Sequence, residues 1–302
     1  MAALMLVIVC LVVGAIAVRL PHPEQLVQGL NWWVLTVALP AMVLQQVSRL
    51  EWEASLLFAG AGLWLVFAGA WLFIAILGKA FGWSRLQIGA LVLTAGLGNT
   101  SFVGYPLIEA LRGLDALGVA VIADQLGSFL MLSTVAVLVG SYYAGSRASA
   151  PELLKRLLTF PAFVALLVAI ALRPVGGLPD LLDDVAGRLG MTLTPLALFS
   201  VGMQLRLRMP AREDRGPLLG GLTWKLLLAP LLVFAVGYSL PLERSLLEIT
   251  TLQAAMAPMI TGGLLAQQLG LARDLATRMV GFGILLSLLT VPLVNFLLTG
   301  GF

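Results

Sequence analysis

The sequence predicts an all-α integral membrane protein, and three observations support this fold class. Hydrophobic residues make up 60% of the 302 residues and charged residues only 11%, whereas an ordinary globular protein carries about 25% charged residues. So few charges could not cover a soluble surface, and the apolar balance also excludes a disordered chain. The charges separate ten apolar windows of 16 to 25 residues, and a helix needs roughly 20 residues to cross a bilayer. Transmembrane strands would be half as long and alternate in polarity, so we expect helices.

Each expected span is a stretch without Asp, Glu, Lys or Arg. In chain order the spans are 1–18, 25–48, 54–78, 86–108, 125–146, 157–172, 189–205, 226–242, 249–272 and 279–302. We expect the fifth span to begin near Leu117 and the eighth near Pro217, which places Asp124 and Lys225 inside the membrane. The motif Ala15-Ile-Ala17 resembles a signal cleavage site, but no Lys or Arg precedes the apolar run. We therefore expect the first span to be retained.

The loop charges predict an orientation, because Lys and Arg accumulate on the cytoplasmic side. With the N-terminus outside, the inside loops hold 12 of the 18 Lys and Arg residues, including Arg147, Arg206 and Arg208, and the outside loops hold five. The remaining basic residue is Lys225, which we expect within the membrane. Both termini are therefore expected outside, with the protein in the inner (cytoplasmic) membrane of a bacterium. The net charge of +3 is attributed to this bias, and no nucleic-acid partner is expected.

Residues 144–159 are the most loop-like inside segment and divide the chain into two repeats of five spans, 1–143 and 160–302. We expect this linker to carry a short amphipathic helix. Because five is an odd number, two similar halves must have opposite topology. Weak similarity supports two such halves, since the second span of each carries a central proline, Pro40 and Pro195.

The fourth span of each half is interrupted by Gly, Pro and small polar residues, at 95–106 and 252–263. Proline removes a backbone donor, and the groups that this frees must line a polar cavity or be buried in protein. Proline and glycine can also merely kink a helix, but two breaks at matching positions favour a transporter binding site. The expected substrate-binding residues are Asn99, Thr100, Ser101, Tyr105, Pro106, Gln253, Pro258, Thr261 and Gly262.

Residues 99–108, Asn-Thr-Ser-Phe-Val-Gly-Tyr-Pro-Leu-Ile, closely resemble the Asn-Thr-x-x-x-Gly-x-Pro-Leu signature of the auxin efflux carrier family. Further matches follow in order over essentially the whole chain, at Leu30-Asn31 through Ala41, Asp124-Gln125, Pro195-Leu-Ala, Lys225 through Pro230 and Leu264-Leu-Ala266. Plant members carry a long insert between the halves, so the short linker resembles that of a compact bacterial member.

This resemblance implies the ten-helix inverted-repeat fold of bile acid/sodium symporters and sodium/proton antiporters. In that fold helices four and nine cross at their breaks. They belong to a transport domain of helices three to five and eight to ten, which moves like an elevator against a scaffold of helices one, two, six and seven. The implied substrates are organic anions, auxin in plants and dicarboxylates such as malonate or malate in bacteria. Many relatives carry Asn near Thr261, where this chain has a shorter hydroxyl side chain.

Asp124 lies about 13 Å into its span, at 1.5 Å per residue, and Lys225 lies similarly deep. A lone carboxylate at that depth is a functional candidate, here a proton carrier. The two side chains could instead form a buried structural ion pair, and both interpretations stay open. Glu109 lies three residues before Arg112, which favours a surface pair between them.

The sequence thus predicts a secondary transporter of a small organic anion, with the bilayer, a proton and a second copy of the chain as further candidate partners. The alternative is a cation/proton antiporter using Asp124, although such antiporters usually carry Asp-Asp or Asn-Asp where this chain has Asp124-Gln125. A membrane sensor usually adds a soluble domain, and these 302 residues contain none. Cys10 and His22 are isolated, and no nucleophile–base set or phosphate loop occurs. We therefore expect neither an enzyme nor a bound cofactor or metal.

Overall fold

The chain is helical throughout the computed structural model, which describes residues 2–146, 149–205 and 209–300. The first half contains α1 (Ala2–Ala17), α2 (Pro23–Trp33), α3 (Leu39–Arg49), α4 (Leu57–Phe81), α5 (Arg85–Gly96), α6 (Tyr105–Arg112), α7 (Leu117–Ile122) and α8 (Val137–Ala144). The linker helix α9 (Ala150–Thr159) precedes α10 (Pro161–Leu172), α11 (Asp180–Gly190), α12 (Leu193–Gln204), α13 (Arg212–Thr223), α14 (Ala229–Tyr238), α15 (Arg244–Ala254), α16 (Ile260–Gln268) and α17 (Arg273–Leu298). Arg147, Arg206 and Arg208 lie outside the described residues.

Six continuous helical stretches are long and apolar enough to cross a membrane: Pro23–Arg49, Ala54–Phe81, Leu114–Ala144, Asp180–Gln204, Arg212–Tyr238 and Arg273–Leu298. Each overlaps one of the expected spans, and together they make the protein an integral membrane protein. The remaining expected spans are not long single helices. Leu4–Ala17 is a shorter apolar helix, α9 and α10 are bent by 67°, and the fourth and ninth spans are each split in two.

Three prolines explain much of the irregular helical geometry. A π-helical turn ends two residues before each of them: Val34–Ala38 before Pro40, Thr100–Gly104 before Pro106, and Trp224–Leu228 before Pro230. Proline lacks the N–H that an α-helix bonds to the carbonyl four residues earlier, and a π-turn is one way to absorb that loss. Two more π-turns, Ala123–Phe129 and Leu132–Ala136, lie in the helix that carries Asp124.

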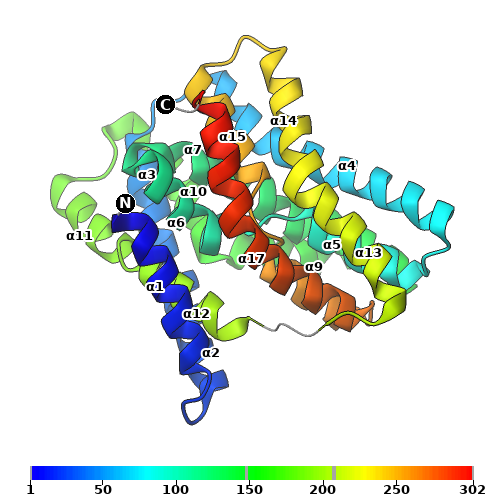
Figure 1. Ribbon diagram of the computed structural model, residues 1–302. Coiled ribbons are helices and arrows are strands. Elements are labelled where there is room, and N and C mark those ends of the chain that lie inside the picture. The colour runs from blue at the N-terminus through cyan, green and yellow to red at the C-terminus, as the bar shows by residue number, and fades with distance from the viewer. Residues whose placement is uncertain (1, 147–148, 206–208, 301–302) are drawn as a thin grey trace.

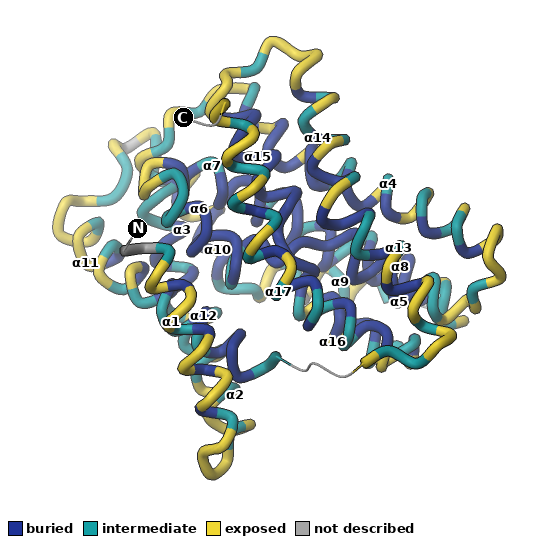
Figure 2. Tube along the Cα trace, viewed as in Figure 1, coloured by how far each residue is buried: buried dark blue, intermediate teal, exposed yellow. Residues whose placement is uncertain are grey.

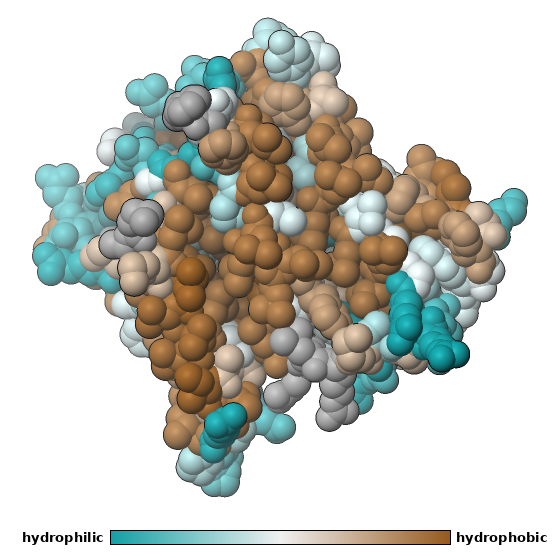
Figure 3. All heavy atoms as spheres, in the orientation of Figure 1, coloured by the Kyte–Doolittle hydropathy of each residue, from teal (hydrophilic) through white to brown (hydrophobic). Residues whose placement is uncertain are grey.

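The helices form a slanted bundle in which α1, α2 and α11 lie on one side and α4, α13 and α14 on the other (Figure 1). The most buried segments lie between them, around α6, α7 and α10, whereas α1 and α17 expose one face (Figure 2). Hydrophobic side chains cover most of the visible surface over α1, α14 and α17, and polar side chains gather at the ends of the helices (Figure 3). This distribution suits a chain surrounded by lipid along its middle.

Candidate functional site

The two broken spans meet at their breaks. Helix α5 ends at Gly96 and α15 ends at Ala254, and helix resumes at Thr100 and Ile260. The unwound segments between these helices lie antiparallel, and Gly98 pairs with Pro258 in an isolated β-bridge. The Asn99 N–H donates to the Ala257 carbonyl at 2.7 Å, and the Met259 N–H donates to the Leu97 carbonyl at 3.0 Å. Each break therefore satisfies backbone groups that the other break frees, which a lipid-embedded protein requires.

Two glycines allow the crossing to pack closely. A Cβ on Gly283 of α17 would lie 2.2 Å from Cδ of Pro258, so only glycine lets α17 approach the unwound backbone. A Cβ on Gly262 would lie 2.7 Å from the Leu93 carbonyl of α5. Pro258 and Gly262, both expected at the substrate site, thus pack the crossing, and neither is among the residues that line the cavity of about 370 Å³ beside it.

Asn99 begins the second half of the broken fourth span. Its side-chain Oδ1 accepts a hydrogen bond from the Phe102 N–H at 3.2 Å, as an N-cap does. Its amide Nδ2 is buried and has no hydrogen-bond partner among the described residues. The cap therefore fixes the side chain while leaving its donor free at a helix N-terminus, where the backbone N–H groups and the helix dipole also favour an anion.

Asp124 organises the same helix start from the neighbouring span. Its carboxylate accepts hydrogen bonds from the hydroxyls of Thr100, of Ser101 at 3.2 Å and of Tyr105 at 2.8 Å. The Gln125 amide donates a fourth hydrogen bond at 2.8 Å. Three of these donors lie in the first six residues of the half-helix, so Asp124 fixes its beginning. The carboxylate is 2% exposed, and four donors offset the cost of burying it.

Lys225 lies on the other side of the crossing, where it is completely buried. Its ammonium donates to the carbonyl of Ala254, the last residue of α15, at 3.0 Å, and a cation is favourable at a helix C-terminus. Among the described side chains, Asp124 and Lys225 form no ion pair with each other. The possible ion pair between Asp124 and Lys225 is therefore absent, and each side chain has its own partners in a nearby helix end.

Gln253 joins the two halves beneath the crossing. Its amide Nε2 donates to the Thr100 carbonyl at 3.4 Å and to the Ala120 carbonyl at 3.2 Å. Gln253 is fully buried, as are Thr100 and Tyr105. These residues and Pro106 surround the crossing and are not among the residues that line the cavity of about 370 Å³.

A cavity of about 370 Å³ reaches the crossing. Of the expected site residues, Asn99, Ser101, Thr261 and Asp124 line it. The cavity is also lined by polar and aromatic residues that are not among the expected substrate-binding residues: Asn31, Ser133, Gln204, Gln268, Phe102, Phe129 and Phe160. Among the described lining residues none is Lys or Arg, so any anion there must be held by neutral donors and helix ends.

For some of these additional residues the sequence held a feature that could have predicted them, and for others it held none. Asn31 belongs to a segment that matched the family pattern, and its Oδ1 accepts a hydrogen bond from the Ser200 hydroxyl at 2.6 Å. Phe160 follows the linker helix directly and stacks on Phe129 with ring centroids 4.0 Å apart. Ser133 had no local signal, because a lone serine in an apolar span most often bonds its own helix.

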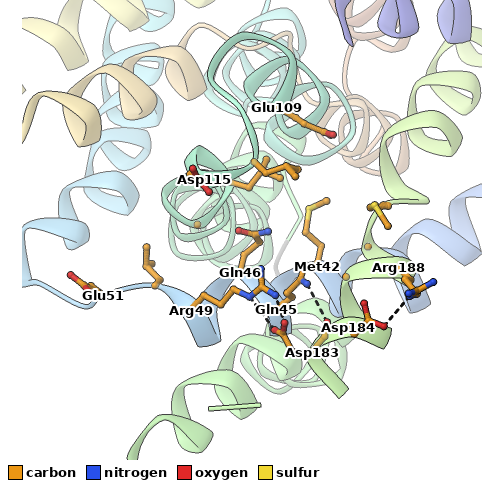
Figure 4. Close-up of a pocket in the computed structure, with 17 residues that line it drawn as sticks. Met42, Gln45, Gln46, Arg49, Glu51, Glu109, Asp115, Asp183, Asp184 and Arg188 are labelled. Atoms are coloured by element: carbon orange, nitrogen blue, oxygen red, sulfur yellow. Dashed lines mark hydrogen bonds and ion pairs between the residues drawn. The ribbon is translucent and has the colours of Figure 1, made fainter. Parts of the chain in front are cut away.

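A second pocket, of about 540 Å³, lies among α3, α6, α7 and α11. Figure 4 shows Glu109 and Asp115 facing Arg49, Asp183, Asp184 and Arg188 across it. The expected pair between Glu109 and Arg112 does not form. Glu109 instead accepts a hydrogen bond from the Thr194 hydroxyl of α12 at 2.8 Å.

Arg112 pairs with Glu248 of α15 at 2.6 Å. Glu248 also accepts from Arg244 at 2.6 Å. The contacts of Arg112 and Glu109 thus run to other helices and not to each other.

A helical membrane chain with two broken spans paired at a buried polar crossing has the architecture of a membrane transporter. Residues 1–295 match the family described as "Membrane transport protein", and the chain belongs to this family of auxin efflux carriers. It is therefore a transporter and not an enzyme.

Two relatives agree with this assignment. The chain is 28% identical over 222 residues to an uncharacterized transporter of Methanothermobacter thermautotrophicus, and the match covers 71% of each chain. It is 26% identical over 191 residues to an uncharacterized transporter of Methanocaldococcus jannaschii, covering 60% of this chain and 61% of the relative.

Proposed function

We propose that the protein is a secondary transporter of a small organic anion, a carboxylate or dicarboxylate, which binds at the crossing of the two broken spans. The observation that carries the proposal is the unpartnered amide of Asn99, which lines the cavity at the start of a half-helix. Thr261 adds a hydroxyl to the lining of the same cavity. The two half-helix N-termini contribute backbone donors and positive dipole ends. A carboxylate is the ligand that such neutral donors suit.

The proposed mechanism is an elevator within two inverted repeats, 1–143 and 160–302, joined by the linker 144–159. We group α1–α3 with α10–α12 as the scaffold, and α4–α8 with α13–α17 as the transport domain. Among the hydrogen bonds and ion pairs of the described side chains, only that from Thr194 to Glu109 joins the two groups. Two bodies that share so few polar contacts can slide past each other at low cost, which supports the division.

The cavity opens toward the side that we propose is cytoplasmic. Gln204, Gln268 and Phe160, which line it, lie at the helix ends next to the loops richest in Lys and Arg. The pocket around Glu109 lies at the opposite ends of the helices and does not include Asn99. This arrangement supports an inward-open state, with both termini outside the cytoplasmic membrane.

Proton coupling through Asp124 is part of the proposal, because Asp124 is the one ionisable side chain among the described cavity-lining residues. The same observation favours the alternative function, a cation/proton antiporter that uses Asp124. The two functions differ in the solute that produces a current when it is added alone: an organic anion for the anion carrier, and sodium or protons for the antiporter.

Charge movement in proteoliposomes on a solid-supported membrane separates the two functions. Concentration jumps of malonate, malate, indole-acetate, sodium and protons are applied one at a time. Current on an anion jump, with none on sodium alone, is the result that we expect. Current only on sodium or proton jumps would replace the anion carrier with the antiporter.

A further inference from the structure

Ser133 is a buried hydroxyl without a hydrogen-bond partner in the wall of the cavity. Its side chain is completely buried, and its Oγ has no partner among the described residues. It lies in the π-turn Leu132–Ala136, nine residues after Asp124 along the same span. It lines the cavity that reaches Asn99.

A helical serine or threonine normally returns its hydroxyl to a carbonyl three or four residues earlier. The adjacent Thr134 does so, donating to the Leu130 carbonyl at 2.6 Å. Ser287, equally buried in α17, donates to the Ile284 carbonyl at 2.7 Å. Ser133 forgoes this bond, and a buried polar group left unpaired is costly enough to require an explanation.

The unpaired groups near the cavity are few. Ten buried side-chain nitrogen and oxygen atoms of the described residues lack a partner, and those on cavity-lining residues are Asn99 Nδ2 and Ser133 Oγ. Asn99 presents its donor from the crossing, and Ser133 presents its hydroxyl from the fifth span. Asn99 Nδ2 and Ser133 Oγ are thus two unpaired polar atoms on residues that line the same cavity.

We propose that Ser133 is a second substrate-binding residue, whose hydroxyl donates a hydrogen bond to the anion that Asn99 holds. This inference rests on the proposed anion-carrier function. It also narrows the class of substrate, because two donors in one cavity suit a group rich in acceptor oxygens. A carboxylate supplies two, and a dicarboxylate supplies more.

The test compares Ser133→Ala with Ser287→Ala, a matched removal of one buried hydroxyl. Both variants and the wild type are placed in proteoliposomes, and currents are recorded against malonate, malate and indole-acetate concentration. Because a hydrogen bond to a charged group is lost, Ser133→Ala should raise the half-saturating concentration roughly tenfold to a hundredfold. Ser287→Ala should leave it within about twofold, since its hydroxyl serves only its own helix.

Thermal unfolding without substrate gives a second readout that a structural role would move. Ser133→Ala should melt at or above the wild-type temperature, because an unpaired hydroxyl has been removed. A lower melting temperature together with an unchanged half-saturating concentration would overturn the inference and make Ser133 a structural residue. An unchanged half-saturating concentration alone would also overturn it. Wild-type protein that gives no current with any of the three anions is a different result, which would overturn the proposed function and this inference together.

Discussion

At the scale of residues, Asp124 combines two properties that rarely occur in one side chain. It accepts four hydrogen bonds and so holds the start of the half-helix, yet it also lines the cavity. A proton arriving from the cavity would have to displace one of these donors. Protonation of Asp124 would therefore loosen the segment that carries Asn99, which links proton binding to the geometry of the substrate site.

Replacing Asp124 with Asn tests this link. The amide keeps the size of the side chain but cannot carry a transported proton, so transport should lose its dependence on the pH gradient while substrate binding survives. Substrate-evoked current at several imposed pH gradients, together with a binding isotherm for the same anion, provides the measurement. A pH-gradient dependence equal to that of the wild type would remove Asp124 from the coupling mechanism.

At the scale of elements, the crossing is held by backbone pairing and by close contact with α17. The contact between Gly283 and the Pro258 ring leaves no room for a side chain. The ring is fixed to the unwound backbone, which is itself paired to the other break. Any group added at Gly283 must therefore displace the crossing or α17.

Gly283→Ala should lower the stability by about 1–3 kcal/mol, as overpacking of a filled core does, and should reduce transport. Gly216→Ala in α13 is the control, because a Cβ there would meet no heavy atom within 4 Å. Thermal unfolding of both variants in detergent measures the difference. Equal melting temperatures for the two variants would contradict the packing described for the crossing.

At the scale of the whole molecule, the polar contacts divide the protein into two groups that share the hydrogen bond from Thr194 to Glu109. Glu109 lines the pocket opposite the cavity (Figure 4), so this contact would hold the proposed outer side closed. Its loss should favour the state in which the cavity is closed from the inside.

Thr194→Val removes that hydrogen bond while keeping the shape of the side chain. A net hydrogen bond is worth about 0.5–1.5 kcal/mol, so the inward-open population should fall roughly twofold to tenfold relative to the other state. Labelling of Thr261→Cys from the inside by an impermeant maleimide, in a Cys10→Ser background, reports that population. Thr250→Val is the control, since Thr250 donates only within its own helix, to the Leu246 carbonyl at 2.7 Å. Equal labelling in the two variants would contradict a latching role for the contact.

The sequence alone predicted the larger features of this molecule and missed the contacts that depend on distant segments. Charge-free windows located the helical stretches because burial in lipid excludes charge along the whole of a span. The two breaks were predictable because Gly and Pro act locally on the backbone.

The partners of Asp124, Lys225 and Glu109 were not predictable in this way. Glu109 and Thr194 are 85 residues apart in sequence. Thr100 lies 24 residues from Asp124, and Ala254 lies 29 residues from Lys225, so these partners meet only through the tertiary fold. Ser133 was missed for a related reason, because what distinguishes it is a hydrogen bond that it does not make.

The central claim is that Asn99 binds the substrate anion and does not merely cap its helix, and Asn99→Asp separates the two roles. Aspartate retains the oxygen that accepts from the Phe102 N–H and is as good an N-cap as asparagine. It replaces the free amide donor with an acceptor. We predict a folded protein with a lower melting temperature, because a second carboxylate is buried at the crossing, and a half-saturating anion concentration raised roughly tenfold to a hundredfold. A folded Asn99→Asp protein that binds the anion as the wild type does would show that Asn99 serves the helix alone.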